Sequence, residues 1–363
     1  MKFVLVTGAS TGIGYSSVAH LIKKGYGVFG SVRKQEDATR LQSDFGDNFI
    51  PLIFDVRDES AILDSVEMVK SRLGPEDKLV SIVNNSGIAL GGPIQFLPTD
   101  VYRNQFEVNL FGVVNVTRAY LELLGAYKGA THRGKIVMIS SVSGKRSYPF
   151  VSPYTASKHA LEAFSDSLRR EMMLYGIKVV IIEPGPIKTP IWDKTPSVED
   201  NPFLGTDYES SLRKFYGQMV TKGKLEGLPV EKVGKLVEEV ITINKPKTRY
   251  VITGRKWLDY ILPGILPDRL LDKLFAKFLG IDKELNRSIS LMIEYDAMLN
   301  DNNNEYDYED LSIGKGIGYL NAGLRWAVSD NLLLELNFND INRTQNISQT
   351  AHREFKILYS QKF

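Results

Sequence analysis

The sequence contains no cysteine and only four histidines among its 363 residues. The absence of cysteine excludes disulfide bonds, thiolate catalysis and cysteine-ligated metal sites, and it is consistent with a reducing compartment. The histidines are scattered without the spacing of metal ligands, so we expect no metal site. They are His20, His132, His159 and His352.

A large excess of charge and a long apolar run are also missing. The formal net charge is +2, so bulk electrostatics give no indication of nucleic-acid binding. The apolar run at residues 3–6 is shorter than the core of a signal peptide and leads directly into a glycine-rich turn. No segment approaches the roughly 20 apolar residues of a membrane-spanning helix. We therefore expect a cytoplasmic protein.

Short apolar segments rich in valine, isoleucine and phenylalanine alternate with longer amphipathic segments. The apolar segments are continuous, as in strands of a parallel sheet that is covered on both faces. The predicted strands are 3–6, 27–32, 49–54, 79–84, 135–140, 178–183 and 249–253, and the predicted helices include 15–24, 59–73, 159–175 and 230–243. Regular alternation of strand and helix predicts an α/β protein with a doubly wound parallel sheet, the Rossmann fold.

The segment from Pro190 to about Leu228 interrupts this alternation with a polar insertion that contains several aromatic residues. A long insertion after the carboxyl end of a strand typically overhangs the ligand crevice of such folds. The alternative is a surface loop without a role.

A change of composition near residues 280–287 indicates a domain boundary. We expect residues 1–286 to form the main domain and residues 287–363 a β-rich tail, with asparagine and aspartate clustered at residues 300–310. The strands predicted in the tail are 288–298, 319–328, 332–341 and 354–363. The tail resembles the last strands of a bacterial outer-membrane β-barrel, although a closed barrel needs roughly eight strands or more. A small β-meander and a fused fragment are the alternatives, and we assign the tail no catalytic role.

A glycine-rich turn follows the first predicted strand and opens a helix. It reads Thr7-Gly8-Ala9-Ser10-Thr11-Gly12-Ile13-Gly14. Glycines let the backbone approach a pyrophosphate, and the N-terminus of the helix favours its negative charge. This strand–turn–helix context predicts a dinucleotide site. Its contacts are expected from Gly8, Ser10, Thr11, Gly12, Ile13 and Gly14.

The end of the second predicted strand indicates which dinucleotide binds. NAD sites normally place a carboxylate there, whereas this strand ends Ser31-Val32-Arg33-Lys34. A guanidinium can hold the 2′-phosphate of NADP in a bidentate, charge-assisted pair. We therefore predict NADP(H) as the cofactor, with Arg33 as the main determinant and Ser31 as an additional ligand. The alternative is that Arg33 and Lys34 belong to a solvated turn.

Four polar residues form a candidate catalytic set. Tyr154 and Lys158 lie four residues apart on one face of a helix, a spacing that carries little information alone because the chain has 17 tyrosines. Ser141 follows a predicted strand at its carboxyl end, 13 residues before Tyr154. Asn109 lies in a helix-like segment, residues 106–112.

Together these motifs resemble those of the classical short-chain dehydrogenases/reductases over residues 1 to about 280. The matching segments are Thr7–Gly14, Asp55-Val56, Asn84-Asn85-Ser86-Gly87, Asn109, Ser141, Tyr154 with Lys158, and Pro184-Gly185-Pro186-Ile187-Lys188-Thr189. Ser86 is a departure, because the family most often has alanine there. The resemblance implies an NADP-dependent oxidoreductase that interconverts an alcohol and a carbonyl.

The resemblance also implies catalytic roles. Tyr154 would exchange a proton with the substrate oxygen, although a free phenol has a pKa of roughly 10. The positive charges of Lys158 and of the oxidised nicotinamide ring are expected to favour the phenolate. Lys158 would also hold the nicotinamide ribose. Ser141 would hydrogen-bond the substrate oxygen, and Asn109 would anchor a water that links Lys158 to solvent.

The remaining motifs imply cofactor contacts. Asp55 and Val56 would face the adenine, and Asn84, Ser86 and Gly87 would line the cofactor and brace the sheet. The nicotinamide would contact a turn that contributes Pro184, Gly185, Ile187 and Thr189.

Substrate and partners are also implied by resemblance. Residues 28–33, the insertion after Pro190 and residues 247–257 are most similar to retinol and hydroxysteroid dehydrogenases, which implies a bulky apolar alcohol or ketone. The apolar stretch 260–279 would close a substrate pocket, rest on a membrane surface or simply pack on the domain. Family members commonly pair through the helices that hold Asn109 and Tyr154, which implies a homodimer or homotetramer.

A non-catalytic protein that senses NADP(H) is the competing hypothesis. Such sensors usually lose at least one of Ser141, Tyr154 and Lys158, and this chain has all three. A third hypothesis docks the chain to a membrane through its tail.

The cofactor assignment makes the first prediction. Because the second strand ends in a cation and lacks a carboxylate, steady-state efficiency should be higher with NADP(H) than with NAD(H). Equal or better use of NAD(H) in the same assay would contradict the role of Arg33.

Overall fold

The computed structural model describes residues 1–194, 201–280, 289–296, 319–329, 332–339 and 352–359. The chain divides into two units, residues 1–272 and 273–363. The predicted domain boundary between residues 286 and 287 lies outside the described residues.

The first unit contains a parallel sheet of seven strands. They are β1 (Lys2–Val6), β2 (Gly27–Val32), β3 (Phe49–Ile53), β4 (Lys78–Asn84), β5 (Lys135–Ile139), β6 (Lys178–Pro184) and β7 (Arg249–Ile252). The strand order is β3-β2-β1-β4-β5-β6-β7, and each neighbouring pair is parallel. The predicted doubly wound sheet is therefore confirmed, and each strand agrees with its predicted range to within one residue at either end.

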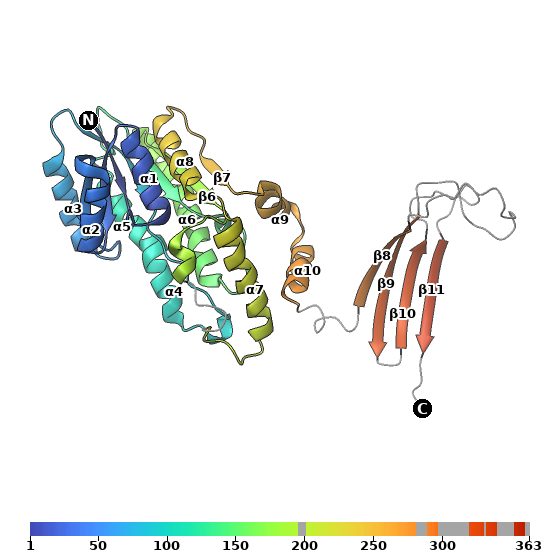
Figure 1. Cartoon of the computed structure of the whole chain (residues 1–363). Helices are drawn as coiled ribbons and strands as arrows, with labels where there is room; N and C mark the ends of the chain where they lie inside the picture. Colours follow the sequence, from blue (N-terminus) through green and yellow to red (C-terminus); the bar gives the residue numbers. More distant parts are fainter. Residues whose placement is uncertain (195–200, 281–288, 297–318, 330–331, 340–351, 360–363) are drawn as a thin grey trace, which may run out of the picture. The chain divides into compact units, whose positions relative to one another are not determined.

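Helices cover both faces of this sheet (Figure 1). The α-helices in the described part of the chain are α1 (Gly12–Lys23), α2 (Gln35–Phe45), α3 (Glu59–Arg72), α4 (Thr99–Phe106), α5 (Gly112–Tyr120), α6 (Ser152–Glu171), α7 (Glu209–Thr221), α8 (Val230–Thr242), α9 (Leu262–Ile265) and α10 (Asp268–Leu279). Of these, α10 spans the division between the two units.

The two cores follow from the alternation of side chains along each strand. On β1, Phe3 and Leu5 face a core that includes residues of α3, α5 and α6. Val4 and Val6 face the opposite core, which includes residues of α1, α2 and α8. Both faces of the strand are buried, which explains why the strand sequences are continuously apolar.

Helix α6 begins at Ser152, seven residues before the predicted start at His159. Its first two turns contain buried polar residues, among them Ser157 and Lys158, in place of an apolar stripe. The hydrophobic periodicity therefore starts later than the helix does. Pro153 at the first turn is compatible with the helix because the N–H groups there need no partner within the helix.

The segment of Asn109 is helical as expected, but its turn is wider than an α-helical turn. Residues Glu107–Phe111 form a π-helical turn, η3, between α4 and α5. Such turns shift the backbone hydrogen-bond pattern locally and are frequent at functional sites. Hydrophobic periodicity gave no indication of this wider turn.

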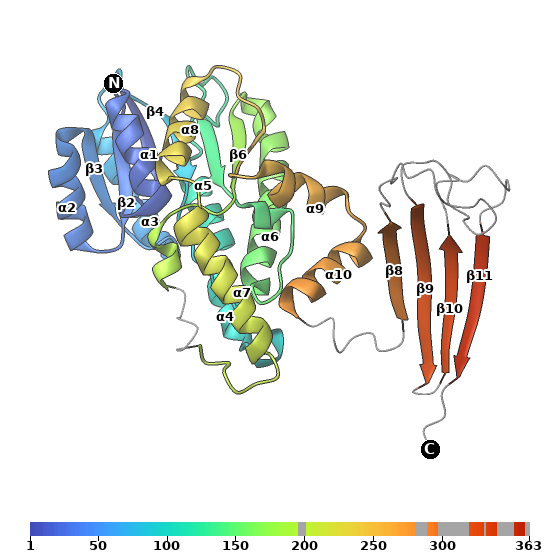
Figure 2. The same cartoon turned by 45° about the vertical axis from the view of Figure 1, so that its right-hand side comes forward.

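The second unit contains an antiparallel sheet of four strands, β8 (Ile289–Asp296), β9 (Tyr319–Ser329), β10 (Leu332–Asn339) and β11 (His352–Tyr359). Figure 2 shows them side by side in the order β8, β9, β10, β11. Leu334 of β10 is paired with Trp326 of β9 and with Ile357 of β11. The four strands predicted in the tail are present.

None of the helices in the described part of the chain has the length and apolar character needed to cross a bilayer.

Candidate active site

The glycine-rich turn between β1 and α1 needs glycine at three positions, Gly8, Gly12 and Gly14. Gly8 and Gly12 have φ values of 65° and 58°, which L-residues with a side chain rarely adopt. A Cβ atom on Gly14 would lie 2.1 Å from the carbonyl oxygen of Gly8. The turn is therefore closed tightly onto the start of the helix.

The N-terminus of α1 is free to bind an anion. The N-cap residue Thr11 makes no side-chain capping hydrogen bond, and the first turn contains no acidic residue. The N–H groups of a first helical turn have no intrahelical partner and carry a partial positive charge. With the cradle that the glycines form, this end of α1 fits the pyrophosphate of a dinucleotide.

The glycine turn is fixed to the end of β4 by Thr7 and Asn85. The Thr7 hydroxyl accepts hydrogen bonds from the backbone N–H groups of Asn85 at 2.9 Å and Ser86 at 3.0 Å. The Asn85 amide donates to the carbonyl oxygens of Thr7 at 2.9 Å and Gly8 at 3.1 Å. This connection joins the loops after two adjacent strands, at the point where the chain order of the sheet reverses.

Arg33 and Ser31, at the end of β2, differ in their exposure. Arg33 is exposed and free to meet a ligand, as expected. Ser31, in contrast, is 1% exposed, and its hydroxyl accepts a hydrogen bond from the Gly8 N–H at 3.1 Å. Ser31 therefore holds the glycine turn in place, and its predicted contact with the 2′-phosphate stays a prediction.

A second cation lies near this turn. Arg40 of α2 donates to the carbonyl oxygen of Ser10 at 2.8 Å and pairs with Asp37 at 2.9 Å. Arg40 was not among the residues predicted from the sequence, because a lone arginine on an exposed helix face has no motif around it.

Asp55 and Val56 lie directly after β3. The Asp55 carboxylate forms a bidentate pair with the Arg57 guanidinium, at 3.0 and 2.8 Å. The hydrogen bonds from Arg57 hold the pKa of Asp55 below its usual value. Val56 is buried, and its side chain packs against Gly112, where it occupies the space that a Cβ atom would need.

Asn84, Gly87 and Asn109 lie at the end of β4 or close to it. Asn84 donates to the Thr117 hydroxyl of α5 at 3.0 Å and so braces the sheet. Asn109 pairs with both backbone groups of Ile88: its Oδ1 accepts from the Ile88 N–H at 2.9 Å, and its Nδ2 donates to the carbonyl at 3.0 Å. A Cβ on Gly87 would lie 3.4 Å from Asn109 Oδ1 and 3.9 Å from Lys158 Nζ. Asn109, Gly87 and Lys158 therefore meet in one place.

Lys158 and Tyr154 extend from α6 toward this point. Lys158 is 5% exposed, and its Nζ donates to the Ile139 carbonyl at 2.9 Å. The same Nζ lies 5.8 Å from the centroid of the Tyr154 ring. Ser141 follows β5, and its hydroxyl donates to the Pro184 carbonyl at 3.5 Å and accepts from the Ser143 N–H at 3.1 Å.

The expected acidity of Tyr154 is not a property of the protein alone. Burial raises the pKa of Tyr154 above its usual value, and the hydrogen bond with Ser141 opposes this only in part. Burial also lowers the pKa of Lys158 to about 8, although the charge of Glu162 opposes that shift. The sequence indicates a nearby cation but not the depth at which both groups are buried. The expectation that Lys158 and the oxidised nicotinamide ring together favour the phenolate concerns the complex with cofactor, and it stays a prediction.

The turn after β6 faces the glycine turn. The Gly185 N–H donates to the Ile252 carbonyl at 2.8 Å, and Ile187 bridges to Leu228. A Cβ on Gly12 would lie 3.4 Å from the Thr189 side chain. The predicted residues of both turns, including Pro184 at the end of β6, are thus brought to one edge of the sheet.

An aromatic cluster lies immediately before α6. Phe150 has a φ of 61°, the only non-glycine residue with positive φ among the described residues, and its carbonyl accepts from the Gly92 N–H at 2.7 Å. Its ring lies 6.0 Å from that of Tyr208 and 5.5 Å from that of Phe215. Strained backbone of this kind is typical of functional sites. The insertion after Pro190 therefore packs next to the segment that leads to Tyr154.

The comparisons with known proteins agree with this geometry. The family model described as short chain dehydrogenase matches residues 2–200. An NADPH-dependent 3-dehydrocapnine reductase from Ornithobacterium rhinotracheale is 43% identical over 277 residues, 76% of this chain and 97% of that protein. Retinol dehydrogenase 16 from Mus musculus is 31% identical over 283 residues, 75% of this chain and 87% of that protein. The crystal structure of a short-chain dehydrogenase from Streptomyces avermitilis has a TM-score of 0.59 and 27% identity, and covers 78% of this chain and 96% of that one.

The glycine turn makes the second prediction. Gly14→Ala should lower the free energy of unfolding by about 1–3 kcal/mol and weaken dinucleotide binding, because the new methyl group collides with backbone. Gly217→Ala in α7 is the matched control, since nothing lies within 4 Å of its Cβ position. This control should be stabilising by roughly 0.5–1 kcal/mol. Chemical denaturation and calorimetric titration with NADPH measure both effects, and a Gly14→Ala protein with the parent's stability and affinity would contradict the closed turn.

Proposed function

Because the chain belongs to the short-chain dehydrogenase family and is an oxidoreductase of that type, we propose that it uses NADP(H) to interconvert an alcohol and its carbonyl compound. One observation carries the proposal. Lys158 Nζ lies 5.8 Å from the ring of Tyr154, whose phenol interacts with Ser141, beside the turns that follow β4 and β6.

Each of the four predicted catalytic residues has its own role in proton transfer. The cofactor supplies or accepts the hydride when bound. Tyr154 donates the proton to the substrate oxygen in reduction and removes it in oxidation. Burial raises the pKa of Tyr154, so nearby positive charge is needed to favour the phenolate when the proton is transferred. Ser141 stabilises the charge that develops on the substrate oxygen.

Lys158 and Asn109 support the proton donor. The Lys158 ammonium binds the nicotinamide ribose and favours the phenolate that forms when Tyr154 gives up its proton. Asn109 holds the backbone of Ile88 with its side-chain amide, so the water that links Lys158 to solvent would bind to its backbone. The wide turn of η3 supports this role, since it interrupts the regular backbone hydrogen bonding around Asn109.

The choice of NADP(H) rests on the end of β2 and on the relative named above. Arg33 is exposed where the adenosine ribose is expected, and no carboxylate takes its place at the end of this strand. Arg40, through its contact with Ser10, adds a second cation on the same side of the glycine turn. Two cations at this position favour a 2′-phosphate over a free hydroxyl.

The substrate is a bulky apolar carbonyl compound in this proposal, with 3-dehydrocapnine as the first compound to test. The aromatic cluster of Phe150, Tyr208 and Phe215 supports the apolar character, because it stands next to the segment that leads to Tyr154. The relative named 3-dehydrocapnine reductase matches this chain over 97% of its own length. This similarity supports 3-dehydrocapnine as the substrate and reduction as the direction of the reaction.

Two partner surfaces belong to the same proposal. The helices that hold Asn109 and Tyr154 form the contact of a homodimer or homotetramer, and Phe111 on this side is exposed although it is apolar. The segment after β7 makes peripheral contact with a membrane. In this segment Trp257 is 62% exposed and Ile265 is 66% exposed. Basic side chains lie within a few residues of each along the chain, as in segments that rest on a membrane surface.

Sedimentation tests both surfaces. Alone, the protein should sediment as two or four copies of the chain. With anionic phospholipid vesicles, part of it should pellet, and Trp257→Ser should reduce that fraction because it removes an exposed apolar anchor. A monomer would contradict the first surface, and an unchanged supernatant the second.

Substitution of the proton donor tests the reaction. Tyr154→Phe should lower kcat for NADPH-dependent reduction by about 10²–10⁴-fold, because the phenolic proton is lost, and should leave the Kd for NADPH unchanged. Tyr175→Phe, at the far end of the same helical segment, is the matched control and should behave as the parent does.

The same assay of the parent protein distinguishes an enzyme from a protein that only senses NADP(H). Oxidation of NADPH with 3-dehydrocapnine or with another bulky ketone supports the proposal. Tight binding of NADPH without turnover of any carbonyl in a panel of steroid, retinoid, quinone and short-chain compounds would favour the sensing protein instead.

A further inference from the structure

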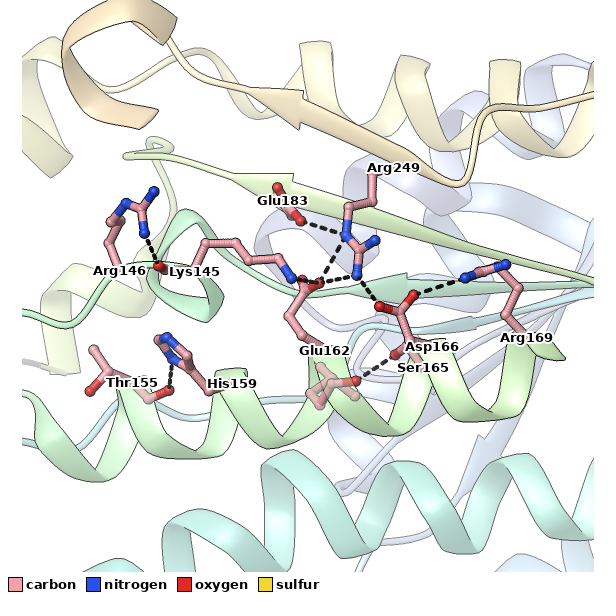
Figure 3. Close-up of polar contacts among 11 residues, drawn as sticks. Lys145, Arg146, Thr155, His159, Glu162, Ser165, Asp166, Arg169, Glu183 and Arg249 are labelled. Carbon is pink, nitrogen blue, oxygen red and sulfur yellow. Dashed lines mark hydrogen bonds and ion pairs between the residues drawn. The ribbon is translucent and has the colours of Figure 1, made fainter. Parts of the chain in front are cut away.

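A group of charged side chains lies one helical turn beyond Lys158, and the reaction proposed above does not use it. Figure 3 shows that these side chains come from α6, β6, β7 and the turn after Ser141 and point toward one another. Its carboxylates are Glu162, Asp166 and Glu183, and its cations are Lys145, Arg169 and Arg249. Glu162 is 3% exposed and Glu183 is 0% exposed, so two of the carboxylates are fully buried.

Arg249 joins the three carboxylates. Its Nη2 donates to Glu162 Oε2 at 2.9 Å and to Asp166 Oδ2 at 2.9 Å, and its Nε donates to Glu183 Oε1 at 3.1 Å. These contacts raise the pKa of Arg249 although burial opposes the shift. Arg249 therefore ties β6 and β7 to the helix that holds Tyr154 and Lys158.

Glu162 has a second set of contacts that Asp166 lacks. Its Oε2 also pairs with Lys145 Nζ at 3.3 Å, and Lys145 is the fourth residue after Ser141. A Cβ on Gly144 would lie 2.9 Å from Glu162 Cγ and 3.2 Å from the Lys158 carbonyl oxygen. Glu162 thus stands between the segment that follows Ser141 and the helical turn of Lys158.

Lys158 has no carboxylate of its own within salt-bridge distance in the part of the chain that the structure describes. Its ammonium donates a hydrogen bond to a neutral carbonyl, Ile139 O. A buried ammonium without a counter-charge loses its proton readily, because the charged form is poorly solvated. Glu162, four residues along α6, is placed to supply that charge, since residues at this spacing are neighbours on a helix surface.

We propose that Glu162 is a positioning residue for the reaction: its carboxylate keeps the Lys158 ammonium protonated and, through Lys145, fixes the segment that follows Ser141. The inference rests on the proposed function. The charge of Glu162 acts against the effect of burial on the pKa of Lys158, which agrees with the geometry.

The groups that face Glu162 come from four elements. They are Lys145 after η4 (Val142–Gly144), Lys158 and Asp166 on α6, Glu183 on β6 and Arg249 on β7, and a further element, η8 (Trp257–Ile261), adds Tyr260. Burial and the charge of Glu162 raise the pKa of Glu183 above its usual value. Glu162 itself accepts hydrogen bonds from Arg249 and pairs with Lys145, and it is the carboxylate nearest to Lys158 along the helix.

Glu162→Gln is the decisive variant, because it removes the charge and keeps the size and an accepting oxygen. Asp166→Asn is the matched control: it lies on the same helix and contacts the same atom of Arg249, but it stands one turn farther from Lys158. Loss of the Arg249 contact should lower the stability of both variants. Only Glu162→Gln should change the titration of Lys158.

The titration is followed in the protein without cofactor by NMR of ¹³C-labelled lysine, with the Lys158 ε-methylene signal assigned from its absence in Lys158→Met. The parent should titrate near pH 8. In Glu162→Gln the midpoint should fall by about one pH unit, as expected for the loss of one nearby opposite charge, and in Asp166→Asn it should stay at the parent's value. This measurement needs no turnover, so it separates failure of the inference from failure of the proposed function.

The pH profile of NADPH-dependent reduction gives the second readout. The alkaline limb of kcat should move to lower pH by a similar amount in Glu162→Gln and stay in place in Asp166→Asn, because Lys158 loses its proton earlier only in the first variant.

If Glu162→Gln does not fold, Glu162→Asp decides, since it keeps the charge with a shorter reach and should keep the midpoint near pH 8 with a lower kcat. Equal midpoints in the parent, Glu162→Gln and Asp166→Asn, or a shifted midpoint in a folded Glu162→Asp, would overturn the inference.

Discussion

The burial of the Lys158 ammonium is the constraint on which the candidate site depends. Removing a cation from water costs several kcal/mol even after relaxation, and the protein must offset that cost locally. Here the offset comes from one carbonyl, Ile139 O at 2.9 Å, and from the field of Glu162. The position of Lys158 is therefore fixed by the structure around it, and Tyr154 and Gly87 are placed relative to that position.

The parallel sheet supplies the remaining elements of the site at one edge. The strands β1, β4, β5 and β6 are adjacent, and all run in the same direction. Their carboxyl ends therefore deliver the glycine turn, the Asn85–Gly87 segment, Ser141 and the turn after Pro184 to neighbouring positions. Hydrogen bonds between the loops, such as that from Asn85 to Gly8, hold these segments together across gaps of more than 70 residues in the sequence.

The strands and the glycine turn could be predicted from the sequence because each depends on residues that are close together in the chain. Continuous apolar segments located the strands to within one residue, and the glycine spacing located the dinucleotide turn. Helix α6 began earlier than predicted because polar site residues fill its first two turns. The contact of Ser31 with Gly8 and the raised pKa of Tyr154 could not be predicted from the sequence, since both depend on burial that arises only when distant elements pack. The contacts of Arg249 connect residues 66 to 87 positions apart, and no local pattern indicates them.

The claim that a buried ammonium organises the site is tested most directly by calorimetric titration of Lys158→Met with NADPH. Methionine fills a similar volume without a charge, so the variant should keep a Tm close to that of the parent. The account predicts that its affinity for NADPH falls by about 10–100-fold, as expected for the loss of charge-assisted hydrogen bonds. An affinity equal to that of the parent in a folded Lys158→Met protein would contradict it.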